Sequence, residues 1–149
     1  MSTDAKVTKD LMETLEDGRK GFADAADKLA DGDAAGLAPK FREFSQQRAA
    51  MYTELEALAA KYGDDLDEDS SVASALHRGW MALKDAVAGS SPKGVLDAAE
   101  QGEDHAVKEY ERALEDKDLS AELAVVVRRQ LVQITAAHDE VKRLRDSQK

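Results

Sequence analysis

The chain has 149 residues, the length of a single domain (1–149), and contains no cysteine, which excludes disulfides, thiolate metal sites and a cysteine nucleophile. Its 31 acidic and 21 basic residues give a net charge of -10, which disfavours nucleic acid and anionic membranes as partners. No apolar run approaches the ~20 residues of a membrane span and no signal core follows the N-terminus, so we expect a cytoplasmic protein.

Apolar residues recur at helical spacing through the first part of the chain. They predict one helix over about residues 4–29 and a second over about residues 35–62. Asp31-Gly32-Asp33 breaks the pattern between them, and Pro39 stands near the start of the second helix, where a missing N–H costs little. Because the break is short, we expect the two helices to be antiparallel neighbours.

The middle of the chain is predicted to be a long crossover. Residues 64–71 form an acidic link, and residues 72–87 again show helical spacing, which indicates a short helix. We expect the single tryptophan, Trp80, to anchor this helix on the bundle, with His77 and Arg78 partly exposed beside it. The alternative is a ligand or partner site beneath the helix.

Two more long helices follow the crossover. Ser91 before Pro92 is a helix start signal and predicts a helix over about residues 92–116, and a last helix ends near residue 145. The long helices each have roughly 23–28 residues, about 35–42 Å. Two hairpins of long helices joined by a long crossover predict an all-α fold, a ferritin-like up-down-down-up four-helix bundle with a short extra helix in the crossover.

Several polar residues fall on faces that the apolar pattern turns inward: Arg48, Glu103, Tyr110, Gln130 and His138. A buried arginine needs a carboxylate, which its planar fork can bind bidentately. We therefore expect Arg48 and Glu103 to pair in a polar core layer, extended by His138 or Gln130. Such a layer fixes helix register more surely than it adds stability.

A carboxylate-bridged di-metal site is the alternative for the same region. Such a site takes one Glu from each of two helices and a Glu-x-x-His pair from each of the other two, and it suits iron or manganese. The chain contains no Glu-x-x-His, and Arg48 stands where an inward Glu is required. The candidate ligands that remain are Glu103, His138, Glu16 and Glu100.

Other catalytic patterns are missing from the sequence. There is no phosphate-cradling glycine loop and no Gly-x-Ser-x-Gly elbow, and the three histidines lie on different segments. We therefore predict a non-enzymatic bundle without catalytic residues or cofactor, with an iron- or manganese-binding oxidase as the alternative.

Four stretches carry a resemblance that covers nearly the whole chain: LEDGRKGF at 15–22, RAAMYTEL at 48–55, VASALHRGW at 72–80, and GED at 102–104 with AHD at 137–139. Together they resemble a bacterial ferritin-like family of four-helix-bundle proteins of unknown function, related in fold to ferritins and rubrerythrins. The resemblance implies a cytoplasmic bacterial protein linked to stress response, with no established activity and no metal-ligand motif. The habits of ferritin-like bundles also imply a homodimer.

Overall fold

The computed structural model describes residues 3–62 and 92–147, and within these ranges the fold is all-α, with no strand. The elements are α1 (Thr3–Ala30), a short 3₁₀ helix η1 (Ala35–Leu37), α2 (Ala38–Tyr62), α4 (Pro92–Leu114) and α5 (Ala121–Ser147). The four long helices that the apolar spacing predicts are therefore confirmed. The predicted short helix over residues 72–87, with His77, Arg78 and Trp80, lies outside the described residues.

The start of the second helix differs from the sequence prediction. Residues 35–37 form the 3₁₀ turn η1, and α2 begins only at Ala38. Pro39, the second residue of α2, explains the position of this boundary, because its fixed φ and missing N–H suit the first turn of a helix. The 3₁₀ turn then brings the chain from the end of α1 to the start of α2.

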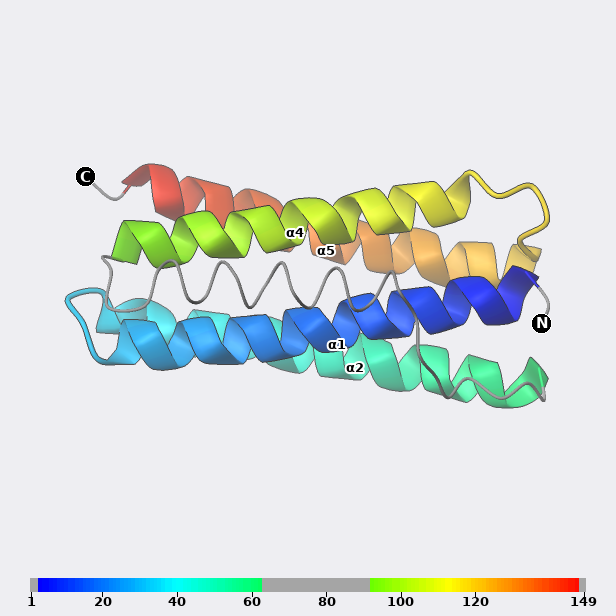
Figure 1. Cartoon of the computed structure of the whole chain (residues 1–149), viewed down its shortest axis with the longest axis horizontal. Coiled ribbons are helices and arrows are strands. Elements are labelled where there is room, and N and C mark those ends of the chain that lie inside the picture. The colour runs from blue at the N-terminus through cyan, green and yellow to red at the C-terminus, as the bar shows by residue number, and fades with distance from the viewer. Residues whose placement is uncertain (1–2, 63–91, 148–149) are drawn as a thin grey trace.

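The helices form two antiparallel hairpins that pack side by side (Figure 1). In the first hairpin α1 runs back along α2, and in the second α4 runs back along α5. The two hairpins meet chiefly where α1 packs against α4. None of the described helices is long and apolar enough to cross a lipid bilayer.

The link between α4 and α5 is held by Ser120. Its Oγ accepts a hydrogen bond from the backbone N–H of Leu123 (3.2 Å), which makes Ser120 the N-cap of α5. Its own backbone N–H donates to Asp4 Oδ1 of α1 (2.9 Å). The cap therefore also ties the second hairpin to the beginning of the first.

The core consists of two apolar clusters, one toward each end of the bundle. The first is built from Leu11, Met12, Leu15, Met51, Leu55, Leu58, Ala106, Tyr110, Ala113, Leu123, Val127 and Ile134. The second is built from Phe22, Ala25, Ala26, Leu29, Ala38, Phe41, Phe44, Val95, Leu96, Ala99, Ala137 and Val141. Arg48 of α2 and Glu103 of α4 lie between the two clusters, and both are buried. The middle of the bundle is therefore polar.

Candidate functional site

The middle of the bundle holds a buried ion pair between the two hairpins. Arg48 of α2 donates from Nη1 to Glu103 Oε1 of α4 at 2.6 Å and from Nη2 to Oε2 at 2.5 Å. Each side chain is only 1% exposed. This bidentate geometry is the strongest form of an arginine–carboxylate contact, and it uses both carboxylate oxygens of Glu103.

Helix α1 closes the ion pair from a third side. The ring of Phe22 lies 5.2 Å from Arg48 Cζ, within the range of a cation–π contact. A Cβ atom at Gly18 would lie 3.5 Å from Arg48 Nη1, which is ordinary van der Waals contact, so α1 packs directly against the guanidinium at this position. The pair thus brings α1, α2 and α4 together around one charge-neutral group.

A second polar contact lies farther along the core, toward the Leu11 end. The Tyr110 hydroxyl donates to Gln130 Oε1 at 2.7 Å, and Gln130 Nε2 donates to Glu54 Oε1 at 2.8 Å and to the Met51 carbonyl at 3.3 Å. Burial raises the pKa of Tyr110 far above its usual range, so the phenol stays protonated and remains a donor. Gln130 therefore joins α4 and α5 to α2.

His138 is not part of the interior layer, and this corrects the sequence prediction. Its Nε2 lies 2.5 Å from Asp104 Oδ1 on α4, its Nδ1 lies 3.2 Å from Asp139 Oδ1, and its side chain is 18% exposed. The inward stripe of α5 runs through Ala137 instead. One residue turns a side chain by about 100° around a helix, which moves His138 to the flank of the α4–α5 hairpin.

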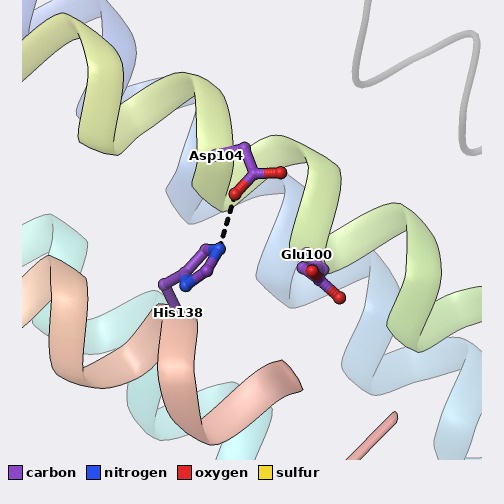
Figure 2. A group of neighbouring side chains, drawn as sticks. All are labelled: Glu100, Asp104 and His138. Carbon is purple, nitrogen blue, oxygen red and sulfur yellow. Dashed lines mark hydrogen bonds and ion pairs between the residues drawn. The ribbon is translucent and has the colours of Figure 1, made fainter. Parts of the chain in front are cut away.

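The four candidate metal ligands, Glu103, His138, Glu16 and Glu100, do not all lie together in the structure. Glu103 is bound to Arg48, and Glu16 pairs with Arg19 of its own helix, with Arg19 Nε 2.7 Å from Glu16 Oε1. Glu100 and His138 do come together, with Asp104 as a third member that the sequence analysis missed (Figure 2). Each of these three residues has one potential ligand atom, and the three atoms lie within 4.8 Å of one another.

The spacing of Asp104 and Glu100 in the sequence could have indicated that they lie together. The two residues are four apart on one helix, so they share a face one turn from each other. What the sequence could not show is that this face of α4 meets His138 of α5. Figure 2 shows the Asp104 carboxylate and the His138 ring facing each other across the two helices.

The flank cluster formed by Glu100, Asp104 and His138 lies among further carboxylates and beside Arg145. Arg145 of α5 forms an ion pair with Glu100 and lies 3.6 Å from Asp97 and 2.9 Å from Asp146. Asp139 adds a further carboxylate beside His138. The carboxylates outnumber the arginine, so the local potential favours a cation.

The pKa of His138 reflects these neighbours. Burial by itself lowers this pKa, because it disfavours the charged imidazolium. Hydrogen bonds to Asp139 and Asp104, together with the charges of these carboxylates, outweigh burial and raise the pKa of His138 above its ordinary value of 6.5. The neighbouring carboxylates therefore favour the protonated form of His138.

These features define an all-α helical-bundle protein with a closed ion pair at its centre. The chain belongs to the family described as the domain of unknown function DUF2383, whose model matches residues 5–116. That match includes nearly all of α1, and α2 and α4 with both Arg48 and Glu103, whereas His138 and Gln130 lie beyond it. A search among curated proteins finds no match to the chain.

The first prediction concerns the buried ion pair. Arg48→Ala is expected to lower the free energy of unfolding by about 3 kcal/mol, because it leaves the Glu103 carboxylate buried and unpaired. Urea denaturation followed by circular dichroism measures the change. The double variant Arg48→Met with Glu103→Leu removes both charges and is expected to recover most of this loss.

Arg42 provides the matched control on the same helix. Its side chain is 50% exposed and lies 3.6 Å from Asp27. Arg42→Ala should change the free energy of unfolding by no more than about 0.5 kcal/mol. An equally small effect of Arg48→Ala would contradict the role assigned to the buried pair.

The second prediction concerns the ionisation of His138. Asp104→Asn should lower the pKa of His138, as measured by an NMR titration of the ring, whereas Glu111→Gln, an exposed charge change farther along α4, should leave it unaltered. Because the folded-state pKa is raised, the stabilisation from His138 is fully present below its unfolded pKa of about 6.5. It is lost as the pH rises through the folded-state pKa, and a stability profile that rises across that window would refute this assignment.

Proposed function

We propose that this protein is a non-enzymatic, ferritin-like four-helix bundle, in which an arginine takes the interior place that ferritins and rubrerythrins give to metal. The observation that carries the proposal is the bidentate contact between Arg48 and Glu103, with both side chains 1% exposed. The role that fits such a bundle is binding, to a second copy or to another protein.

The chemistry of the interior supports this proposal. Both oxygens of Glu103 already accept hydrogen bonds from Arg48, and a cation placed beside them would face the buried guanidinium. Among the described buried side chains, the carboxylates are Glu103 and Asp17, and neither belongs to a group of residues that could share a metal ion. Di-metal chemistry needs several converging ligands, and residues 3–62 and 92–147 do not bring such a set together in the interior.

The direction of the helices supports the ferritin-like part of the proposal. In Figure 1, α1 and α5 run in one direction along the bundle, and α2 and α4 run in the other. This order is up-down-down-up, which requires a long crossover between α2 and α4. A bacterial, cytoplasmic setting and a link to stress response are part of the same proposal and come from the resemblance of the sequence alone.

A second copy of the chain is the first partner to consider, because α5 exposes two large apolar side chains to solvent. Val125 is 60% exposed and Val132 is 70% exposed. They are seven residues apart, so they lie on one face of α5 two turns from each other. This pair is a suitable centre for a small homodimer contact.

The third prediction tests whether the interior binds metal. Protein purified from cells supplied with iron and manganese should contain no metal that depends on Glu103, so Glu103→Gln should leave the metal content per chain unchanged in mass spectrometry. His138→Ala keeps the interior pair intact and serves as the comparison. Stoichiometric iron or manganese that is lost in Glu103→Gln but retained in His138→Ala would refute the proposal in favour of a metal-dependent oxidase.

The fourth prediction tests the homodimer. Sedimentation velocity at increasing protein concentration should show a dimer, and Val125→Lys with Val132→Lys should convert it to a monomer. Ala57→Lys with Ala60→Lys adds the same two charges at exposed positions of α2 and should leave the dimer intact. A monomer at every concentration of the unmodified protein would remove self-association from the proposed function.

A further inference from the structure

We propose that Glu100, Asp104 and His138 form a mononuclear site for a first-row divalent cation such as Zn²⁺. The site lies on the flank of the α4–α5 hairpin and not between the two hairpins. It is independent of the Arg48–Glu103 pair and goes beyond the proposed binding function of the bundle.

The geometry of the three side chains is the first argument. The two carboxylates come from successive turns of α4 and the imidazole from α5, and their potential ligand atoms lie within 4.8 Å of one another. Zinc bonds to nitrogen and oxygen are about 2.0–2.2 Å long, so ligand atoms around one tetrahedral ion lie roughly 3.3–3.6 Å apart. Small side-chain rotations therefore suffice to bring the three atoms to a common ion.

The orientation of His138 is a second, separate argument. Its Nδ1 lies 3.2 Å from Asp139 Oδ1, while its Nε2 points to Asp104 and lies 2.5 Å from Oδ1. A histidine that ligates a metal with one nitrogen usually donates its other N–H to a carboxylate, which fixes the tautomer and the ring. Asp139 provides this outer carboxylate, so the ring is already aimed with Nε2 toward the two carboxylates of α4.

The charges around the cluster allow a cation to enter. Arg145 forms an ion pair with Glu100 and also contacts Asp97 and Asp146, so it keeps acidic partners when it releases Glu100. Asp104 Oδ1 and His138 Nε2 already lie 2.5 Å apart on the same side of the cluster. A divalent ion can thus take the Glu100 carboxylate together with these two atoms without stranding a buried charge.

The ligand types decide which ions fit. An imidazole disfavours Ca²⁺ and Mg²⁺, which prefer oxygen ligands alone, and the chain has no thiolate to offer. One imidazole with two carboxylates suits zinc, cobalt, iron or manganese, and at equal concentration zinc binds more tightly than manganese. Three protein ligands leave at least one coordination position for water.

The experiment uses the full chain after its metal has been removed by a chelator. Titration with Zn²⁺ in a calorimeter should show one ion per chain, and Co²⁺ should give the visible absorption of a site with nitrogen and oxygen ligands. His138→Ala and Asp104→Asn should each weaken Zn²⁺ binding by at least about 100-fold, and Asp139→Asn by about 10-fold, as expected for a residue that orients a ligand.

His105→Ala is the matched control, because His105 follows Asp104 on α4, is exposed and is not one of the three residues of the cluster. It should leave Zn²⁺ affinity unchanged, as should Arg48→Met with Glu103→Leu, which alters only the interior. Circular dichroism confirms that each variant is folded, and His138 is partly exposed, so its loss should not unfold the bundle.

Two results would overturn the inference. One is an unmodified protein that binds neither Zn²⁺ nor Co²⁺ with one ion per chain, and the other is binding that survives both His138→Ala and Asp104→Asn. Binding that is lost only when Glu103 is changed would refute the proposed function as well, because it would place the ion in the interior. The failures of the two proposals are therefore distinguishable.

Discussion

The ion pair between Arg48 and Glu103 is the interaction on which the arrangement of the bundle depends. It joins α2 to α4, which belong to different hairpins, and both partners lie between the two apolar clusters of the core. Hydrophobic contact along a long helix is tolerant of a shift by one turn, whereas a bidentate ion pair is not. A slip of either hairpin would leave both charges buried and unpaired, so we infer that the pair favours one register of α2 against α4.

Much of this arrangement could be predicted from the sequence, because burial follows helical periodicity. Four long stripes of apolar residues predict the four helices, and an arginine and a glutamate on inward stripes predict a pair. The periodicity is less reliable at the edge of a stripe. His138 follows Ala137 directly, and the sequence could not decide which of the two belongs to the interior, although they point about 100° apart.

The flank cluster could not be predicted for a different reason. Glu100 and Asp104 are visibly one turn apart, but in a chain with 31 acidic residues such pairs are common. Their significance comes from His138 and Asp139, which belong to another helix and reach α4 only through the packing of the second hairpin. Contacts between helices depend on crossing angle and rotation, and these are properties of the packed structure and not of any single helix.

The buried Arg48–Glu103 pair and the flank cluster differ in how their carboxylates are neutralised, and this difference bears on function. A buried carboxylate in a helical bundle needs a positive charge beside it, and a metal ion or an arginine can supply that charge. Here the chain itself provides the cation for Glu103, because Arg48 binds both oxygens of its carboxylate. The acidic flank between α4 and α5 is partly exposed, and Arg145 is the cation that pairs with Glu100 there. Metal at that position would therefore bind to a bundle that is already folded, and it would act as a reversible ligand and not as a requirement for the fold.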